Sequence, residues 1–432
     1  MRIAVIGAGW AGLAAALRAQ DRGFHPVVIE AARVPGGRAR CLQSNALDTE
    51  IDNGQHILLG AYTETLALMR RLGIPIQTAF CEQTLHLESA DKQFRLRAWP
   101  LPAPWHQLGA ILGARGLSLG QRLHTIRLLS ALKGADWRTP NRITVTQWLA
   151  GHATSTPLIE RIWAPLCLAT MNTPLDLADA QLFAHVLRDS LGAHAAASRV
   201  LIPRGTLNQL WPEQACKQLP EVRLGQHVQA IHTDGSGYRV DDEPFDGVIV
   251  ATPPHASQRL LAALALPDAQ ADWWDAWPDW HYEAIGTVSL RLAQPWRLPH
   301  PMLMLWEHPT RQQFGQWLFD RSVSGRGSSD DLLHIVISQA SRTAHLTAIE
   351  VIAGVTQQLR EQVARPLPTV VAQTLVTEKR ATFSAVPGLR RPQTRTPWPN
   401  LLLAGDWTDT GYPAVLEGAV RSGLAAADQL GI

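Results

Sequence analysis

The stretch that most restricts the fold of this chain is the N-terminal run that ends at Glu30, "MRIAVIGAGWAGLAAALRAQDRGFHPVVIE". A short β-branched run leads into the pattern G-x-G-x-x-G at Gly7, Gly9 and Gly12, and a helical pattern follows that Gly23 closes. A second apolar run then ends in the acid Glu30. This order predicts a β-α-β unit in a parallel sheet, and therefore an α/β protein.

Each part of this unit has a physical role in binding a dinucleotide. Gly7 permits a tight turn, Gly9 lets the backbone approach a pyrophosphate, and Gly12 lets the helix pack closely on the sheet. The first helical residues, Trp10 and Ala11, present main-chain N–H groups to the phosphates. We therefore expect these five residues to bind a dinucleotide cofactor.

The residues after the unit indicate which dinucleotide is bound. Glu30 lies eighteen residues after Gly12, where a carboxylate can accept hydrogen bonds from both ribose hydroxyls and would repel a 2′-phosphate, which disfavours NADP. The next stretch, "AARVPGGRAR", supplies Gly36, Gly37 and Arg38. A second glycine turn with a cation can bring N–H groups and a guanidinium to the diphosphate. We therefore favour FAD over NAD.

Two later apolar runs indicate that distant parts of the chain complete the first sheet. "FDGVIVATPP" is stopped by Pro253 and Pro254, and "NLLLAGDW" ends in Gly405 and Asp406. We expect a discontinuous Rossmann-like FAD-binding domain and an inserted mixed α+β substrate domain. The first is expected over 1–80, 195–255 and 385–432, and the second over 81–194 and 256–384. Within the second, 101–191 is expected to be mostly helical and 283–292, 334–338 and 370–379 to be strands.

Composition excludes several classes of protein. The 39 Lys and Arg against 37 Asp and Glu give a net charge of +2, so no global field attracts nucleic acid. The four cysteines are far apart and form no C-x-x-C pair, which argues against a zinc knuckle or a disulfide framework and fits a reducing cytoplasm. No window approaches the roughly 18 uninterrupted apolar residues of a membrane span. Any membrane contact is therefore expected to be peripheral.

The glycine turn with Arg38 stands where the FAD-dependent amine oxidase and phytoene desaturase superfamily carries its GG-R motif, and the chain resembles this superfamily over nearly its whole length. "GQHVQAI" resembles the superfamily strand whose main chain holds the adenine, which implies a contact near Val228. "ATPP", which begins at Ala251, resembles the strand that returns after it.

The C-terminal run "LLLAGDWTDTGYPAVLEGAVRSG" also resembles a superfamily motif. The resemblance implies that Asp406, after Gly405, binds the ribityl or pyrophosphate part of FAD. It also implies that the helix after Pro413, with Ala414 and Glu417 at its start, points its N-terminus at the flavin pyrimidine.

Within the superfamily, "DNGQHILLGAYTETLALMRRLGI" together with the C-terminal motif is similar to the squalene-associated desaturases, the hydroxysqualene dehydroxylases of bacterial hopanoid synthesis. The resemblance implies reduction of hydroxysqualene to squalene, a C30 polyisoprene, and contact with upstream enzymes of the squalene pathway. Loss of water from an allylic alcohol leaves a delocalised cation, to which a reduced flavin can deliver hydride. Such a site needs an acid and dry apolar walls, but no metal and no nucleophile.

Candidates for the acid come from the segments that the motifs place beside the flavin. The turn at Asn53 and Gly54 is expected where the backbone passes close to the flavin, and the apolar run beyond is expected to be a helix. Between them, Gln55 and His56 form a polar pair. His56 is the first candidate because an imidazole titrates near neutral pH, and a histidine that is hydrogen-bonded only for structure is the equal alternative.

Asp409, Tyr412 and Glu417 are second candidates for the acid. Tyr412 is also expected to cover the flavin ring, and Glu417 is also expected to cap or brace the C-terminal helix.

The region between Asp91 and Asp136 contains seven Lys and Arg and no acidic residue. Tryptophan, leucine and isoleucine are interleaved with these cations. A basic amphipathic helix of this kind can lie in an anionic bilayer surface, whereas a solvated helical face over an ordinary core is the alternative. We expect a cytoplasmic protein that is peripheral on the inner face of the bacterial membrane.

Three other functions share parts of this pattern. A carotenoid desaturase has the same flavin motifs but runs the opposite redox direction, and a polyamine or porphyrinogen oxidase has the same fold with another substrate. A prenyl-binding escort protein could use the fold without catalysis, but it would not need Glu30, the GG-R turn and Asp406.

Overall fold

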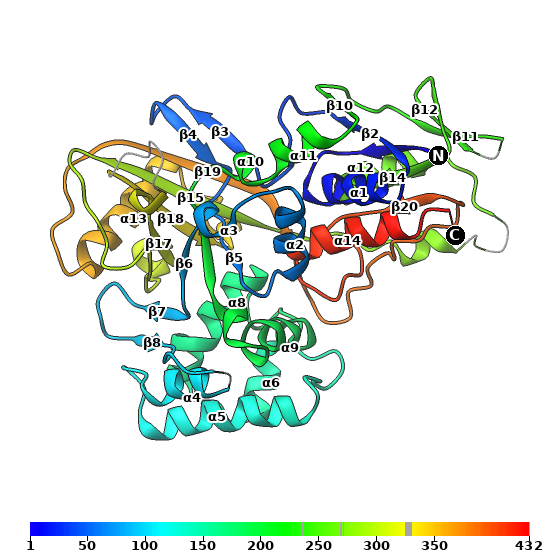
Figure 1. The fold of residues 1–432 in the computed structure, drawn as a ribbon. Coiled ribbons are helices and arrows are strands. Elements are labelled where there is room, and N and C mark those ends of the chain that lie inside the picture. Colours follow the sequence, from blue (N-terminus) through cyan, green and yellow to red (C-terminus); the bar gives the residue numbers. More distant parts are fainter. Residues whose placement is uncertain (103, 236, 268–269, 271, 325–330, 432) are drawn as a thin grey trace.

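The computed structural model describes residues 1–102, 104–235, 237–267, 270, 272–324 and 331–431. Two five-stranded sheets and a layer of helices form the molecule (Figure 1). The first sheet has the order β10-β2-β1-β14-β20, and all of its pairings are parallel. Its strands are β1 (Arg2–Ile6), β2 (His25–Glu30), β10 (Glu221–Leu224), β14 (Gly247–Val250) and β20 (Leu401–Leu403).

Helices cover the parallel sheet because its strands are apolar on both faces, as parallel strands usually are. Helix α1 (Trp10–Asp21) follows β1, and α14 (Leu416–Asp428) packs along it. The central strands β1, β2 and β14 are almost wholly buried. The β-α-β unit and the two returning strands predicted from the sequence are therefore confirmed.

The predicted strand at "GQHVQAI" is wrong. Strand β10 ends at Leu224 and β11 (Ile231–Asp234) begins only after Ala230. Gly225 adopts a φ of +74°, and the main-chain N–H of Gln226 donates to the Glu30 carbonyl at 2.9 Å. The left-handed glycine therefore turns the chain away from the strand direction. A small antiparallel sheet of β11, β12 (Gly237–Val240) and β13 (Glu243–Phe245) follows.

The second five-stranded sheet is antiparallel, with the order β16-β17-β18-β15-β19. Helix α13 (Ala348–Gln362) packs on it through a shared apolar core. The three strands predicted for this region are present and are longer than predicted. The strands are β15 (Tyr282–Leu292), β16 (Met302–Met304), β17 (Trp317–Asp320), β18 (Leu332–Ser338) and β19 (Val370–Phe383).

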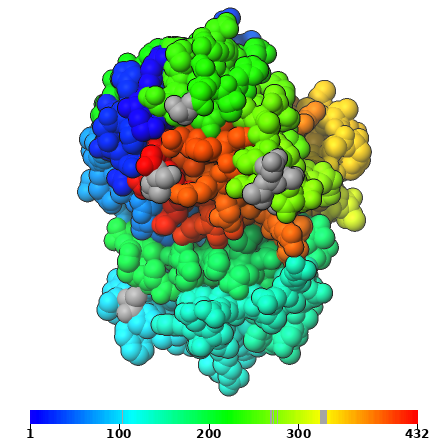
Figure 2. Space-filling model, turned by 90° about the vertical axis from the view of Figure 1, so that its right-hand side faces the viewer, coloured from blue at the N-terminus to red at the C-terminus, as the bar shows by residue number. Residues whose placement is uncertain are grey.

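A helical layer forms one end of the molecule, as predicted for 101–191 (Figure 2, cyan to green). Two of its helices begin with a capping box, in which the N-cap residue and the residue three positions later bond each other reciprocally: Ser118 with Gln121, and Thr144 with Gln147. The helices are α4 (Trp105–Leu112), α5 (Leu119–Gly134), α6 (Val145–Gly151), α7 (Thr156–Leu158), α8 (Ala164–Met171) and α9 (Ala180–Leu187). No helix within the described ranges is long and apolar enough to cross a membrane.

Short elements connect these three parts. The strands are β3 (Cys41–Ser44), β4 (Thr49–Asp52), β5 (Leu58–Leu59), β6 (Phe80–Gln83), β7 (His86–Glu88), β8 (Arg95–Arg97) and β9 (Val200–Pro203). The helices are α2 (Thr63–Arg71), α3 (Ile76–Ala79), α10 (Leu207–Leu210), α11 (Pro212–Gln218) and α12 (Pro254–Leu261).

The apolar run after His56 was expected to be a helix, but it begins as a strand. Leu58 and Leu59 form β5, which pairs with β9, and α2 starts only at Thr63. A Cβ added to Gly60 would lie 1.8 Å from the Ala196 carbonyl oxygen. The run is therefore held as an extended segment by close backbone packing, which apolar periodicity alone does not reveal.

Candidate cofactor and catalytic site

The two glycine turns predicted to bind phosphate lie against each other. Gly9 pairs with Gly36 as an isolated bridge, and the Gly36 N–H donates to the Ala8 carbonyl at 2.8 Å. A Cβ added to Gly12 would lie 1.9 Å from the Gly7 carbonyl oxygen, and one added to Gly37 would lie 3.0 Å from the Gly9 Cα. The turns therefore form a cradle of backbone that larger residues would fill.

Glu30 ends β2 beside this cradle. Its carboxylate accepts hydrogen bonds from the main-chain N–H groups of Ala8, at 2.7 Å, and Ala32, at 2.8 Å. Each carboxylate oxygen has a second lone pair, so the main chain orients the group and leaves it able to accept bonds from ribose hydroxyls. The cradle, the N-terminus of α1 and this carboxylate together fit the adenosine diphosphate part of FAD.

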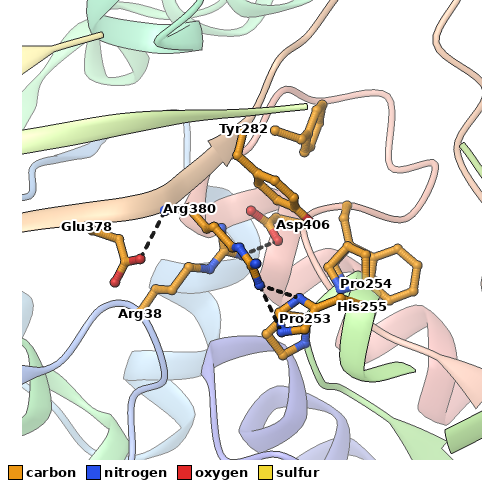
Figure 3. A pocket seen from close by; sticks show the side chains of 10 residues that line it. Arg38, Pro253, Pro254, His255, Tyr282, Glu378, Arg380 and Asp406 are labelled. Carbon is orange, nitrogen blue, oxygen red and sulfur yellow. Dashed lines mark hydrogen bonds and ion pairs between the residues drawn. The ribbon is translucent and has the colours of Figure 1, made fainter. Parts of the chain in front are cut away.

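A pocket of about 140 Å³ lies where the two large sheets meet (Figure 3). Arg38 and Asp406 form an ion pair in its wall, and Arg38 also donates to the Ala381 carbonyl of β19 at 2.7 Å. The Tyr282 hydroxyl is buried there and has no hydrogen-bond partner in the part of the chain that the structure describes. The full lining is Arg38, Pro253, Pro254, His255, Tyr282, Glu378, Arg380, Phe383, Asp406 and Trp407.

The pocket lies at the carboxyl ends of parallel strands, which is where open α/β sheets bind ligands. Pro253 follows β14 and Asp406 follows β20. Gly405, which precedes Asp406, donates its N–H to the Ser422 hydroxyl of α14 at 2.8 Å. An aromatic and charged pocket with an unpartnered hydroxyl is suited to a polar ligand that also has apolar rings, as FAD does.

Gln55 links the turn after β4 to the antiparallel sheet. Its main-chain N–H donates to the Thr287 hydroxyl of β15 at 3.3 Å. Its side-chain carbonyl accepts from Arg321, at 3.3 Å, and from His334 Nδ1 on β18, at 3.2 Å. Burial lowers the pKa of His334 well below its ordinary value, and Arg321 lowers it further, so the ring is neutral. The side-chain carbonyl of Gln55 therefore accepts two hydrogen bonds inside the protein.

His56 is oriented by its own turn. Its Nδ1 lies 2.8 Å from the Gly54 carbonyl oxygen, and because a carbonyl can only accept, we assign the ring proton to Nδ1. Burial lowers the pKa of His56, an effect that the Gly54 carbonyl opposes and the charge on Arg38 reinforces. At neutral pH, His56 Nε2 is therefore a hydrogen-bond acceptor, and the ring becomes an acid only after it takes up a proton.

The second candidates for the acid are all engaged elsewhere. Asp409 has a side chain that is 48% exposed and lies 3.4 Å from Arg391. The Tyr412 hydroxyl donates to Asp189 of the helical layer, and burial together with this bond raises the pKa of Tyr412 to about 12. The Tyr412 hydroxyl is therefore directed at Asp189, and the Asp409 carboxylate at Arg391 and solvent.

Glu417 is buried, but its carboxylate faces α2. It accepts hydrogen bonds from the main-chain N–H groups of Glu64 and Thr65, both at 3.0 Å, and from the Thr65 hydroxyl at 2.7 Å. Arg421, one turn further along α14, donates to the same carboxylate at 2.8 Å. Glu417 therefore caps the N-terminus of a different helix from its own. The Glu417 side chain is therefore not available to bind a cofactor. Only the main chain of Glu417 could contact one.

Pro413 and Ala414 precede α14, and the Val415 N–H donates to the Pro413 carbonyl at 2.8 Å. Val228 is buried, with 4% exposure, in the segment between β10 and β11. The contact of Val228 with the adenine, and that of the helix after Pro413 with the flavin pyrimidine, remain predictions.

Sequence reasoning missed four polar residues of this region: Asp52, Arg321, His334 and Arg391. Asp52 and His334 carried a local signal, because each is a titratable residue at a buried strand position, and His334 interrupts the apolar run "LLHIVIS". Arg391 donates to the Tyr412 carbonyl at 2.7 Å and so holds the C-terminal motif in place.

A second pocket, of about 370 Å³, lies in the helical layer. Its walls are mainly aliphatic, and Gln339, which follows β18, also lines it. The full lining is Thr146, Leu149, Ile159, Leu168, Pro174, Leu175, Asp176 and Gln339.

Comparison with known proteins agrees with this geometry. The chain is 31% identical to a hydroxysqualene dehydroxylase of Rhodopseudomonas palustris, over 98% of this chain and 97% of that one. It is 29% identical to the enzyme of that name from Zymomonas mobilis, with the same coverage, and 24% identical to a probable zeta-carotene desaturase of Synechococcus elongatus, over 99% of this chain and 98% of that one.

Solved structures show the same fold at lower identity. Putrescine oxidase with putrescine bound superposes with a TM-score of 0.70 at 18% identity, covering 99% of this chain and 98% of that one. A putative protoporphyrinogen oxidase from Exiguobacterium superposes with a TM-score of 0.68 at 17% identity, with the same coverage. Residues 10–431 match the family described as flavin containing amine oxidoreductase. The chain therefore belongs to the flavin-containing amine oxidoreductase family, it has that family's fold, and its cofactor is FAD.

Proposed function

We propose that this protein is an FAD-dependent oxidoreductase that reduces hydroxysqualene to squalene. The observation that carries the proposal is full-length similarity, at 31%, 29% and 28% identity, to three hydroxysqualene dehydroxylases. Carotenoid desaturases match at 24% and 23%. A carotenoid desaturase is therefore the second candidate, and the two differ in redox direction.

The proposed reaction breaks the allylic C–O bond, and the hydroxyl takes up one proton and leaves as water. In its reduced form, bound FAD supplies the hydride that makes the new C–H bond. The protein must orient the hydroxyl, provide the proton and keep water away from the allylic carbon. We assign the orienting role to His56, whose Nε2 can accept a hydrogen bond from the substrate hydroxyl.

The lowered pKa of His56 gives this assignment a pH dependence. If the protonated ring is the acid, the rate should rise as pH falls toward that lowered pKa, because the charged form is then populated. If His56 only orients the hydroxyl, the rate should fall with its protonation instead. A pH profile of the rate separates the two roles.

We assign the polyisoprene chain to the helical side of the protein. The aliphatic pocket there provides walls without charge apart from Asp176, and apolar walls both hold a hydrocarbon and exclude water.

The test of the proposed function is a single-turnover reaction. Holoenzyme with its flavin reduced would be mixed anaerobically with hydroxysqualene, and products would be analysed by gas chromatography with mass spectrometry. The expected result is squalene formed in equal amount to the flavin oxidised. Reoxidation without squalene, or desaturation of phytoene by the oxidised enzyme, would contradict the assignment.

We also propose that an anionic membrane surface is a partner. The helical end of the molecule is cyan in Figure 2. Its residues 99–127 expose several large apolar side chains, and cations such as Arg115 and Arg127 are exposed in the same part of the chain. A single amphipathic helix was expected to form this membrane-binding surface. Instead, its exposed apolar residues come from the segment before α4, from α4 itself and from the start of α5. These residues are Trp99, Leu101, Trp105, Leu112, Leu119 and Leu123.

Sedimentation with vesicles of anionic phospholipid tests this partner. We expect binding that rises in low salt, because both the apolar side chains and the cations contribute. Trp105→Ser should weaken it, whereas Ile349→Ser, which removes an apolar side chain 75% exposed on α13, should not. Equal binding by both variants would contradict the proposed surface.

A further inference from the structure

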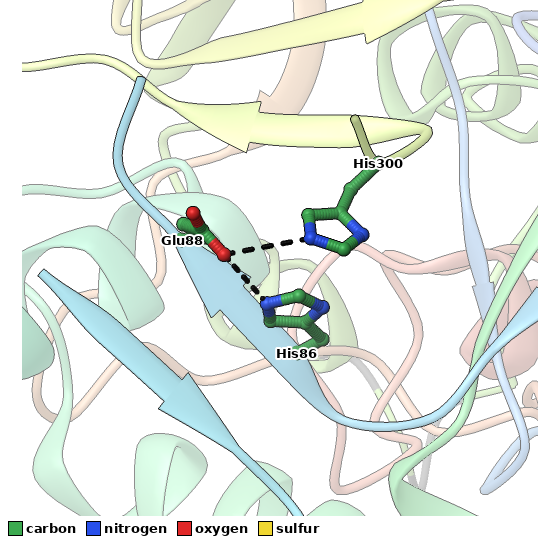
Figure 4. A group of neighbouring side chains, drawn as sticks. All are labelled: His86, Glu88 and His300. Atoms are coloured by element: carbon green, nitrogen blue, oxygen red, sulfur yellow. Dashed lines mark hydrogen bonds and ion pairs between the residues drawn. The ribbon is translucent and has the colours of Figure 1, made fainter. Parts of the chain in front are cut away.

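A second group of polar side chains lies at the junction of the hairpin β7–β8 and the edge strand β16, in elements that do not line the FAD pocket. His86 and Glu88 stand two residues apart on β7, so their side chains point to the same face of the strand. His300 comes from the segment just before β16. Figure 4 shows both imidazole rings directed at the Glu88 carboxylate.

The backbone on both sides of this junction is fixed. Ala90, after β7, donates its N–H to the Met304 carbonyl of β16 at 2.9 Å. The segment before β16 is held by Asp320, whose N–H donates to the Pro301 carbonyl at 3.0 Å and whose carboxylate accepts from Leu298 N–H at 2.8 Å. The three side chains are therefore brought together by main-chain contacts and do not depend on one another for their placement.

The distances between the three side chains suit a bound metal ion. His86 Nε2 lies 3.0 Å and His300 Nε2 lies 3.5 Å from the same oxygen of Glu88, and the donor atoms all lie within 4.8 Å of one another. Tetrahedral zinc with bonds of about 2.0–2.2 Å holds its ligand atoms roughly 3.3 Å apart. Small rotations of the side chains are enough to reach that geometry.

The chemistry of the donors indicates which ions can bind. Each imidazole offers one ring nitrogen and Glu88 offers a carboxylate oxygen, so the three side chains present two nitrogen donors and one oxygen donor. Two imidazoles and one carboxylate suit zinc and similar transition metals, whereas calcium and magnesium prefer oxygen ligands.

We propose that His86, Glu88 and His300 form a binding site for a divalent transition metal of the zinc type, which ties the hairpin β7–β8 to the antiparallel sheet. The His300 side chain is 34% exposed, so the fourth position faces solvent and takes a water molecule. The hairpin leads into α4 and α5, so the metal secures the attachment of the helical layer. The hydride transfer proposed above needs no metal, and the site is structural.

The test is calorimetric titration of chelator-treated holoenzyme with Zn²⁺. We expect one saturable site per chain and a higher thermal midpoint when zinc is bound, because the ion binds the folded state. His300→Ala is expected to weaken binding by at least about tenfold, since even residues that merely orient metal ligands contribute that much. Glu88→Gln, which keeps the shape of the side chain, is the second variant and should also weaken it.

His232→Ala is the matched control, because His232 is an exposed histidine on β11. It should leave zinc affinity and the thermal shift unchanged. Flavin absorbance in every variant reports that the protein is folded. The proposal would be overturned if the protein had no saturable zinc site. It would also be overturned if zinc affinity were equal in wild type, His300→Ala and Glu88→Gln, because the zinc would then bind to other groups, such as the four cysteines.

Discussion

Replacing the buried Asp52 with asparagine is expected to stabilise the folded protein, and by more at high pH than at low pH. Asp52 is 5% exposed at the end of β4, and one carboxylate oxygen accepts the Leu207 N–H at 2.8 Å. Burial raises the pKa of Asp52 from 3.8 to about 6, although Arg321 and the Leu207 N–H both lower it. The asparagine side-chain oxygen can accept the same N–H, so the change removes charge and preserves the contact.

The sign of the effect follows from which state holds the proton more tightly. Because the pKa is raised in the folded protein, protonated Asp52 favours folding, and this stability is lost as pH rises from about 4 through about 6. Each pH unit corresponds to about 1.4 kcal/mol. Relative to the protein with protonated Asp52, the free energy of unfolding is therefore lower by about 3 kcal/mol near pH 8 and by about 1.5 kcal/mol near pH 5. Asp52→Asn should raise the free energy of unfolding by those amounts.

Urea unfolding of wild type and Asp52→Asn at both pH values, followed by tryptophan and flavin fluorescence, measures the difference directly. Asp242→Asn, at an exposed position after β12, is the control and should change stability little at either pH. The reasoning would be refuted if Asp52→Asn destabilised the protein, or if its gain were the same at both pH values. Destabilisation would mean that the attraction to Arg321 outweighs burial, and an equal gain would mean that folding does not raise the pKa of Asp52.

Three further substitutions test the site. His56→Ala should retain bound FAD and lower turnover by about 100-fold, which is what misplacing a substrate by about 1 Å can cost; unchanged turnover would remove His56 from the mechanism. Glu417→Ala leaves the buried N-terminus of α2 without its acceptor and should reduce the free energy of unfolding by about 2–3 kcal/mol, measured by urea titration. Gly12→Ala places a Cβ 1.9 Å from the Gly7 carbonyl oxygen and should yield protein without flavin absorbance. Gly134→Ala, where an added Cβ meets nothing within 4 Å, should remain yellow.

The parts of the fold that were predictable from the sequence are those with local causes. The glycines of the first turn, the acid at the end of β2 and the apolar strands β14 and β20 each follow from steric or burial requirements within a few residues. The strand implied at "GQHVQAI" was wrong because it rested on a resemblance to other proteins, and a resemblance does not reveal that Gly225 of this chain turns the backbone with a left-handed φ.

The remaining contacts of the site join residues that are far apart in the chain. The hydrogen bond between Gln55 and His334 spans 279 residues, and that between Glu417 and Thr65 spans 352. Glu417 was expected to brace its own helix, and it does contact Arg421 one turn away, but its carboxylate also caps α2. A helix-periodic pattern identifies which residues are buried, but it does not identify which distant N–H group a buried carboxylate meets.

The turn after β4 is where the two large sheets depend on each other. The Asn53 amide donates to the Arg38 carbonyl, at 3.0 Å, and to the Glu378 carboxylate of β19, at 3.1 Å. Arg38, which pairs with Asp406, in turn donates to the Ala381 carbonyl of β19. The wall of the pocket at Arg38 and Asp406 is thus built partly by the antiparallel sheet. A substitution that shifts β19 should therefore weaken FAD binding even though the glycine cradle lies in the parallel sheet, because the same strand positions the guanidinium that faces the pocket.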